Sequence, residues 1–415
     1  MPAPLLACIV LFLSLRAILG LRFHVAPMQA YTNKHLRYLF RQLNPSAVLW
    51  TEMEKVQDLL QSNEAADRRL SHNDKNCVLQ LGGNNPRKLE QCIKLALPYK
   101  YSEFNLNCGC PSVESKGAEY GASLMQDPAL TSHLLNTMAD SAGGTPISLK
   151  IRIGAYDTAE DVKEDYGAFA DFVHHVTSDK SSMHICVHAR AAVLSGLSIT
   201  KNRCVPPLRY DFVEQLAKDF PHHAITMNGG IKSLESVAAY SHQANSKNSS
   251  GILDGFMIGR WALKRPLDLA DIHNAMSVPM MSESDKSTCT NVGNVSFGDN
   301  SKSKSFVEVK VDAIRAYSKY AQSALRDGYA PADVMMPLYL LSAQLQEDYE
   351  EEDESGKYES GELDFLYQIL CRGVSDITGD NAESYTNFRK LHTAIKSAGL
   401  GTKVFNKVKR NRNEM

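Results

Sequence analysis

Short runs of apolar and β-branched residues alternate along the chain with segments whose apolar positions recur at helical spacing. Each run suits a buried strand, and the segments between, such as PRKLEQCIKLAL and YDFVEQLAKDF, predict amphipathic helices. The runs lie at 23–28, 47–53, 77–83, 102–109, 147–154, 183–190, 224–230 and 254–260. Eight strand-then-helix units in about 250 residues are typical of a (β/α)8 TIM barrel. A doubly wound open sheet is the alternative, but it seldom needs eight units.

Most of these runs become polar at their carboxyl end. The residues concerned are Gln80, Asn105, Asn107, Lys150, Arg152, His188, Arg190 and Asn228. In a (β/α)8 barrel the carboxyl ends of the strands form the catalytic face, and catalytic residues come from several strands at once. If only one of these residues were present, it would be interpreted as a strand-end side chain hydrogen-bonded to a loop. The agreement among strands predicts an active site.

The last two runs end in glycine. NGG occupies 228–230 and GR occupies 259–260, after the seventh and eighth strands, where barrels often bind a phosphate through backbone N–H groups. NGG alone would be only a turn, but with the GR pair, whose arginine adds a charged fork of donors, it predicts a phosphate site. Lys150, His188 and Gln80 around one phosphate-tethered ligand suggest an aromatic redox cofactor such as a flavin.

The composition changes after the barrel, which we expect over 21–278. Residues 279–305 are rich in Ser, Asn, Asp and Gly and predict a linker. Residues 306–415 show a helical pattern and predict a small all-helical domain, interrupted by an acidic loop at 347–362. The acidic run EDYEEEDE within it indicates a solvated or disordered segment. The basic tail KVFNKVKRNR is either solvated or a contact for a phosphate backbone.

The chain begins with an apolar stretch. LLACIVLFLSL, within residues 1–20, has the length of a signal-peptide core, is too short to span a bilayer, and has no Lys or Arg before it. It predicts a targeting segment, with an apolar lead-in to the barrel or a misassigned start as alternatives. No later stretch is apolar enough to cross a membrane, so we expect no stable membrane association. The nine cysteines lack a CxxC pair, which favours a reducing compartment.

The segment NLNCGCPS at 105–112 places two cysteines one residue apart. This spacing is too tight for the usual disulfide and too close for ordinary zinc ligands, and we expect no metal site. By strand alternation Asn107 and Cys108 face opposite sides, so Cys108 should pack outward against a helix as a small hydrophobe. Cys110 follows the strand end, on a loop at the catalytic face. Of the two cysteines, Cys110 is the candidate for chemistry.

Seven segments, in this order, closely resemble the tRNA-dihydrouridine synthases, and in particular their DusA-like branch. They are VAPMQAYTNKHLRYLFR, NLNCGCPS, GASLM, HARAAVLSGLS, NRCVPPLRY, NGGIKSLE and MIGR. The resemblance covers about residues 23–275, which is the whole expected barrel. In the helical region only FRKL at 388–391 aligns.

The resemblance implies a monomeric enzyme that binds FMN and reduces the C5=C6 bond of D-loop uridines in tRNA, at positions 20 and 20a, with NADPH as the reductant. It implies that a hydride passes from flavin N5 to C6 and that Cys110, in the Gly-Cys-Pro triplet, gives a proton to C5. A neutral thiol, with a reference pKa of about 8.5, can act as this general acid. The target uracil must leave the tRNA stack to reach the flavin.

The resemblance also assigns binding residues. The residues implied to contact the flavin and its phosphate are Pro27, Met28, Gln29, Gln80, Lys150, His188, Asn228, Gly229, Gly230, Gly259 and Arg260. The residues implied to contact tRNA are Asn107, Arg190 and Arg203. The chain departs from the branch at Ala191 and Val193, which replace Lys and Trp, and at Thr200, which replaces a second lysine. These departures bear on the tRNA-binding mode and leave the flavin residues intact.

Two other functions stay open at this point. The chain could be another FMN barrel that acts on a small molecule, although such an enzyme has no use for a helical region over 306–415. It could also be an RNA-binding protein that kept the fold and lost the reaction, although Cys110, Lys150 and His188 argue against lost chemistry. A tRNA substrate requires the cytosol, a mitochondrion or a plastid, so we expect a cytoplasmic or organellar protein.

Overall fold

The computed structural model describes residues 21–61, 63–71, 74–111, 120–233, 236, 253–277, 306–351 and 361–400. The expected targeting segment at 1–20, the linker at 279–305, most of the acidic loop and the basic tail lie outside the described residues. The chain divides into two compact units. Among the described residues, the barrel unit comprises 21–41 and 46–263, and the helical unit comprises 42–45 and 264–400.

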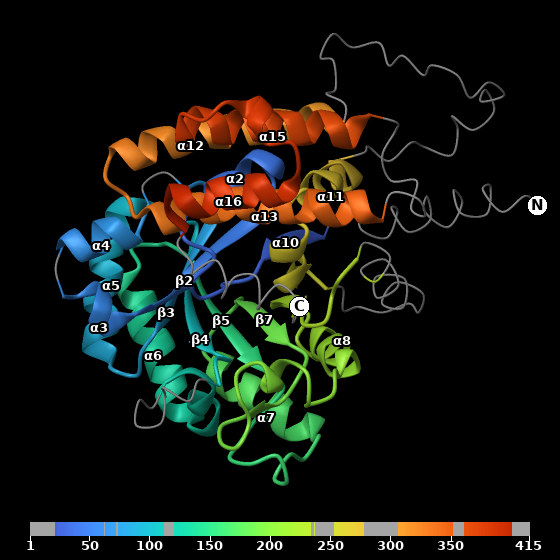
Figure 1. Ribbon diagram of the computed structural model, residues 1–415. Helices are drawn as coiled ribbons and strands as arrows, with labels where there is room; N and C mark the ends of the chain where they lie inside the picture. Colours follow the sequence, from blue (N-terminus) through green and yellow to red (C-terminus); the bar gives the residue numbers. More distant parts are fainter. Residues whose placement is uncertain are drawn as a thin grey trace, which may run out of the picture. The chain divides into compact units, whose positions relative to one another are not determined.

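Eight parallel strands close into a barrel in the order β1-β10-β9-β7-β5-β4-β3-β2 (Figure 1). They are β1 (Arg22–Val25), β2 (Val48–Lys55), β3 (Cys77–Gly82), β4 (Glu103–Cys108), β5 (Ile147–Arg152), β7 (His184–His188), β9 (Ala224–Asn228) and β10 (Gly255–Ile258). Each predicted run overlaps one strand, so the (β/α)8 prediction is confirmed. Two further short strands, β6 (Ala155–Tyr156) and β8 (Ala192–Val193), pair in parallel as a separate sheet.

Short helices connect the strands of the barrel unit, and several begin at a capping side chain. The helices are α2 (Lys34–Leu43), α3 (Val56–Leu59), α4 (Asn63–Arg69), α5 (Pro86–Ala96), η1 (Leu97–Tyr99), η3 (Gly121–Gln126), α6 (Pro128–Ser141), α7 (Tyr166–Thr177), η4 (Lys201–Arg203), α8 (Tyr210–Asp219) and α10 (Arg260–Lys264). The side chains of Asn85, Asp127 and Asp165 accept backbone N–H bonds at the starts of α5, α6 and α7. Each of these helices therefore has a defined start that follows from its sequence.

An apolar layer lies beneath the carboxyl ends of the strands. It consists of the buried residues Ala26, Val48, Trp50, Val78, Cys186 and Met257, and Met28 packs against it. Strand alternation explains the layer, because Val78 and Gln80 on β3, like Cys186 and His188 on β7, point to the same side of the sheet. The inward positions therefore form a hydrophobic floor under the predicted polar site.

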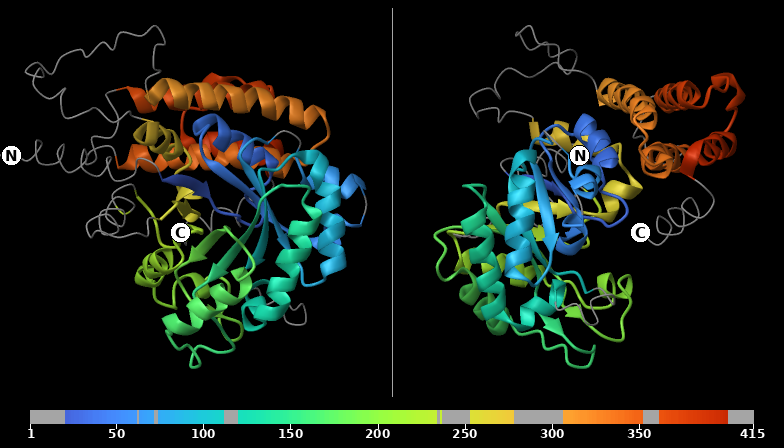
Figure 2. Two further views of the ribbon diagram at one scale, coloured as in Figure 1. Left: turned by 180° about the vertical axis from the view of Figure 1, so that it is seen from behind. Right: turned by 90° about the vertical axis from the view of Figure 1, so that its left-hand side faces the viewer.

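The described part of the helical unit contains three long helices, α12 (Phe306–Arg326), α13 (Pro331–Glu350) and α15 (Glu362–Thr378), and four shorter elements, α11 (Asp268–Ser277), η6 (Ala382–Ser384), α16 (Phe388–Ile395) and η7 (Lys396–Leu400). Figure 2 shows α12, α13, α15 and α16, coloured orange to red, packed side by side. Among the described helices, none is both long and apolar enough to cross a membrane.

Two expectations about this region differ from the structure. The acidic run does not begin as a solvated loop, because α13 continues through Glu350 and the Asp348 side chain is buried. Asp348 accepts a bond from Arg265, and Gln344 joins the same network through Asp268. The units also divide at Leu263 rather than at 278. These bonds explain the earlier boundary, since they tie the start of α11 to α13.

Candidate active site at the carboxyl ends of the barrel strands

Lys150 and Asn228 meet inside the barrel, although they come from different strands. The Lys150 Nζ donates to Asn228 Oδ1 at 3.1 Å, and Asn228 Nδ2 donates to the Met257 carbonyl at 2.9 Å. Burial lowers the pKa of the Lys150 ammonium, and the nearby charge of Arg152 lowers it further. The structure therefore brings two of the predicted flavin residues together, one of them as a largely desolvated cation.

A chain of buried amides runs across β3, β4 and β5. Gln80 Nε2 donates to Asn105 Oδ1 at 2.8 Å, and Asn105 Nδ2 donates to the Ser148 hydroxyl at 2.7 Å. Asn107 Nδ2 donates to Gln80 Oε1 at 2.7 Å. Because every link is buried and bonded, the network fixes both the Gln80 amide and the Asn107 amide. The predicted contacts of Gln80 with a flavin and of Asn107 with a nucleotide stay predictions.

The Cys110 loop is held from both sides. Asn107 Oδ1 accepts N–H bonds from Gly109 at 3.1 Å and from Cys110 at 2.7 Å. The Cys110 carbonyl accepts the N–H of Ala122 at 3.0 Å. Gly121 makes this approach feasible, since its φ is +78° and a Cβ there would lie 2.6 Å from the Cys110 oxygen. The GASLM segment had no role assigned from the sequence. In the structure its first two residues contact the main chain of Cys110, the predicted proton donor.

Cys108 and Cys110 lie in different environments. Cys108 is fully buried in β4, and this burial raises the pKa of its thiol. The packing role predicted for Cys108 agrees with this position. Cys110 is half-buried on the loop after the strand.

The two glycines after β9 are required by close packing. Gly229 has φ +111°, and a Cβ there would lie 2.5 Å from the His188 ring. Gly230 has φ +70°, and its Cβ would lie 2.5 Å from Leu208 Cδ1. Tyr210 donates its hydroxyl to the Gly229 carbonyl at 2.6 Å. The backbone therefore passes close to His188, and the predicted binding of a phosphate at this turn stays a prediction.

The loop after β1 faces the start of α10. A Cβ on Gly259 would lie 3.6 Å from the Met28 sulfur, so the predicted flavin and phosphate residues of these two loops are neighbours. Thr32 fixes Met28, because its hydroxyl accepts the Met28 N–H at 2.9 Å and donates to the Met28 carbonyl at 3.3 Å. Pro27 is half-buried, whereas Gln29 is exposed at the rim.

Five cations surround this site. They are Lys150, Arg152, Arg190, Arg203 and Arg260, and in the part of the chain that the structure describes no carboxylate forms an ion pair with any of them. Burial, followed by repulsion from neighbouring cations, lowers the pKa of Arg190 and Arg203.

Burial and the same cations hold the pKa of His188 well below its usual value, so its imidazole is neutral at pH 7. An uncompensated positive cluster of this kind favours the binding of an anion.

Arg190, Arg203 and Arg260 lie around one turn. Arg190 donates to the carbonyls of Cys204, at 3.3 Å, and Pro206, while Arg203 Nε donates to the Ile199 carbonyl at 3.3 Å. Arg260 Nη1 lies 3.9 Å from the Cys204 sulfur. Two of the three predicted tRNA contacts, Arg190 and Arg203, are therefore grouped with the predicted phosphate arginine.

A second polar cluster lies at the opposite end of the barrel. His24, His184 and Asp254 each offer a metal-ligand atom, and these atoms lie within 4.8 Å of one another. However, the Trp50 indole N–H donates to His24 Nδ1 at 3.2 Å, which leaves the proton of the neutral ring on Nε2. A metal at Nε2 would have to displace that proton. We therefore assign this cluster to the packing of the barrel.

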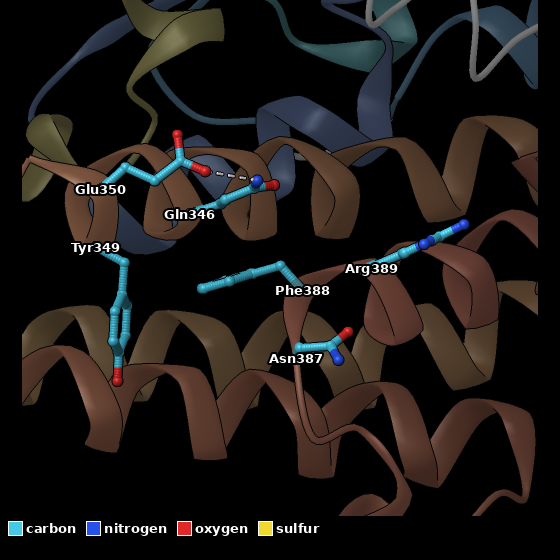
Figure 3. Close-up of a pocket in the computed structure, with 6 residues that line it drawn as sticks. All are labelled: Gln346, Tyr349, Glu350, Asn387, Phe388 and Arg389. Carbon is cyan, nitrogen blue, oxygen red and sulfur yellow. Dashed lines mark hydrogen bonds between the residues drawn. The ribbon is translucent and has the colours of Figure 1, made fainter.

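A surface groove lies in the helical unit, between α13 and α16 (Figure 3). Its volume is about 390 Å³, and it is lined by Gln346, Tyr349, Glu350, Asn387, Phe388 and Arg389. The Phe388 ring lies in the groove, with its centroid 5.7 Å from that of Tyr349, whereas Arg389 points away. It contains none of the site residues predicted from the sequence.

Comparisons with known proteins agree with the arrangement in the barrel. The family model described as "Dihydrouridine synthase (Dus)" matches residues 24–322. The tRNA-dihydrouridine(20/20a) synthase of Xylella fastidiosa (strain Temecula1 / ATCC 700964) is 38% identical over 256 residues, which cover 62% of this chain and 73% of the relative. The enzyme of the same name from Escherichia coli (strain K12) is 38% identical over 251 residues, covering 60% and 68%.

A third relative of that name, from Pseudomonas syringae pv. tomato, is 39% identical over 259 residues, covering 62% of this chain and 72% of the relative. Among solved structures, Old Yellow Enzyme from Pichia sp. AKU4542 covers 64% of this chain and 86% of its own at 14% identity, with a TM-score of 0.30 that is too low to bear on fold or chemistry. The family match spans the barrel and every predicted site residue, and the chain belongs to the dihydrouridine synthase family.

Proposed function

We propose that this protein is a flavin-dependent tRNA-dihydrouridine synthase that reduces the C5=C6 bond of uridines at positions 20 and 20a. Its family and the names of its relatives support this function. The observation that carries it is the group of five cations around Cys110 and His188, for which the described residues supply no carboxylate. Such a site suits a phosphate-bearing cofactor next to a polyanionic substrate.

The residues at the strand ends suit an FMN. Gly229 and Gly230 follow β9 at the strand ends, where barrels often bind a phosphate through backbone N–H groups, and Arg260 adds a charged donor. The half-buried ammonium of Lys150 and the neutral ring of His188 suit an aromatic ring that gains negative charge. A flavin held by these residues would supply the hydride for C6 of uracil, with NADPH as the reductant.

Cys110 supplies the proton in this proposal. Asn107 and Ala122 hold its main chain, and its thiol proton passes to C5 of uracil, leaving a thiolate. A negative charge on Cys110 raises the pKa of both Arg152 and Arg203, so these two cations stabilise the thiolate that forms. The cations thus favour the state reached after proton transfer.

The tRNA is bound through phosphate contacts in this proposal. Arg190 and Arg203 lie at the turn around Cys204, where they can neutralise the backbone beside a uridine that has left its stack. We further propose that the protein acts as a monomer, with NADPH, in a compartment that contains tRNA.

Purified protein tests the proposal directly. The protein is reconstituted with FMN and incubated with NADPH and tRNA from a strain that lacks dihydrouridine, and dihydrouridine is measured by mass spectrometry. We expect yellow protein that forms dihydrouridine only when NADPH is present. Colourless protein that cannot take up FMN would contradict the flavin chemistry. Yellow protein that oxidises NADPH but leaves tRNA unchanged would favour a small-molecule substrate.

A further inference from the structure

Arg152 occupies a central position, and its hydrogen bonds point to a role beyond the stabilisation of the Cys110 thiolate. It is the last residue of β5, shares the inward side of the sheet with Lys150, and is 3% exposed. An arginine carries five N–H donors in a rigid planar fork, so its burial requires several acceptors in fixed places. The positions of those acceptors define its role.

The bonds of Arg152 go to three main-chain carbonyls. Nε donates to Gly109 at 3.1 Å, and Nη1 donates to Asn202 at 3.0 Å and to Ala191 at 3.3 Å. Each acceptor is the chain neighbour of a proposed functional residue, since Gly109 precedes Cys110, Ala191 follows Arg190 and Asn202 precedes Arg203. One planar group therefore joins the proton-donor loop to the two loops that carry the tRNA-contacting arginines.

The loops that carry Ala191 and Asn202 also have hydrogen bonds of their own. The buried Asn202 side chain accepts the Val193 N–H at 2.8 Å and donates to the Val193 carbonyl at 2.9 Å. The Ala192 N–H donates to the Gly154 carbonyl at 2.8 Å, two residues after Arg152. These bonds do not involve Arg152. Loss of its guanidinium would therefore change the distance between the Cys110 loop and the loops of Arg190 and Arg203, and would not unfold any of them.

Electrostatics alone would not favour an arginine here. Burial, followed by the charges of Arg203 and Arg190, lowers the pKa of Arg152 to about 9. In the described part of the chain its partners are neutral carbonyls, with no carboxylate to offset the charge. A buried cation retained at this cost indicates a function that a neutral side chain would not serve.

We propose that Arg152 is a positioning residue that sets the Cys110 loop against the loops of Arg190 and Arg203. This inference rests on the proposed function. tRNA bound by the two arginines then presents its uracil at a fixed distance from the Cys110 thiol. The proposal predicts that Arg152 affects the transfer to uridine and does not affect the reduction of the flavin.

The test compares Arg152→Met and Arg152→Lys with the wild-type holoenzyme. Arg22→Met is the matched control, since Arg22 is bonded to Asp254 in the other polar cluster, at the opposite end of the barrel. Bound FMN and anaerobic flavin reduction by NADPH are measured first, and we expect all variants to stay within about twofold of wild type. We expect single-turnover formation of dihydrouridine to fall about 100-fold in both Arg152 variants, the loss that a misplacement of about 1 Å can cause.

Lysine should not restore activity, because a single ammonium cannot reproduce the fork. Wild-type rates in Arg152→Met or Arg152→Lys, or an equal loss in flavin reduction and dihydrouridine formation, would overturn the inference. The Arg22→Met variant should resemble wild type in both half-reactions.

Hydrogen exchange gives a reading that does not depend on activity. In Arg152→Met we expect peptides that cover 107–111 and 200–206 to exchange faster together, while those from β1 to β3 stay unchanged. An unchanged exchange rate in either peptide would contradict the inference that Arg152 joins these loops. Wild-type protein that forms no dihydrouridine contradicts the proposed function instead, and the exchange result then still decides whether Arg152 joins the loops.

Discussion

Cys108 and Cys110 illustrate how one residue of separation changes the chemistry of a side chain. Cys108 belongs to β4 and is completely buried, so its raised thiol pKa keeps it protonated and inert. Cys110 lies beyond the strand on a half-buried loop, with its N–H bonded to Asn107. The parity of the strand determines this difference, and it separates packing from chemistry.

Substitution of the two cysteines should therefore give different results. Cys110→Ala is expected to keep FMN and NADPH-dependent flavin reduction but to lose about 100-fold or more of uridine reduction, as removal of a general acid does. Cys108→Ala is expected to lower the free energy of unfolding by about 1 kcal/mol, with normal activity. Stopped-flow kinetics and urea unfolding measure these effects, and equal activity losses in both variants would refute the assignment.

At the scale of elements, η3 and α13 both show effects of long-range contacts. The first residue of η3, Gly121, packs its Cα against the Cys110 carbonyl, although ten residues separate the two positions in the sequence. The last turn of α13 holds Asp348, which pairs with Arg265, 83 positions earlier. In each case a short segment owes its conformation to a partner far along the chain.

Gly121→Ala should slow dihydrouridine formation, whereas the same substitution at a glycine without a close neighbour should not. A comparable glycine is Gly144, with φ +87° and no atom within 4 Å of a built Cβ, so Gly144→Ala carries the same backbone strain of about 1–2 kcal/mol without a clash. Because its Cβ would clash with the Cys110 carbonyl, we expect Gly121→Ala to lose more stability than Gly144→Ala in thermal unfolding, and only Gly121→Ala to lose dihydrouridine formation, by about tenfold or more. Equal activity in the two variants would contradict the proposed support of the Cys110 loop.

Asp348→Ala should destabilise the helical unit. Asp348 is 6% exposed and its loss would leave Arg265 partly buried without that carboxylate, so we expect the free energy of unfolding to fall by about 2 kcal/mol. Glu350→Ala is the control, because Glu350 is exposed and bonded only to Gln346 among the described residues. Urea unfolding followed by circular dichroism measures the difference, and similar midpoints for the two variants would show that the acidic run is solvated throughout.

At the scale of the whole molecule, periodicity predicted the barrel because strand alternation and helical spacing are local properties. The strand ends likewise predicted that residues such as Lys150 and Asn228 would meet. The role of Arg152 was not predictable, since its acceptors are backbone carbonyls that no residue letter marks. The burial of Asp348 was missed because composition indicates solvation and says nothing of a partner 83 positions away.

Buried neutral histidines should make the fold sensitive to acid. Burial, aided by neighbouring charges, lowers the pKa of His35 and His223 to about 4 and holds that of His24 well below the usual value. An unfolded histidine has a pKa of about 6.5, so the unfolded chain binds more protons between about pH 6.5 and 4. These groups therefore stabilise the fold fully above about pH 6.5, and the stabilisation is lost as the pH falls through that window.

Unfolding midpoints between pH 7.5 and 4.5 measure this effect. His223→Phe isolates one contribution, because both ring nitrogens of His223 are buried without a hydrogen-bond partner in the described part of the chain and the ring stacks on Phe220. We expect the variant to show a shallower decline with acid than wild type. An unchanged slope would mean that His223 is not the proton acceptor.

The central claim is most directly tested by mapping dihydrouridine in the tRNA of a strain that lacks its own synthase for positions 20 and 20a. Expression of the full chain should restore dihydrouridine at these positions, and the Cys110→Ala variant, expressed at the same level with FMN bound, should not. Yellow, NADPH-oxidising protein in cells whose tRNA still lacks dihydrouridine would contradict the account.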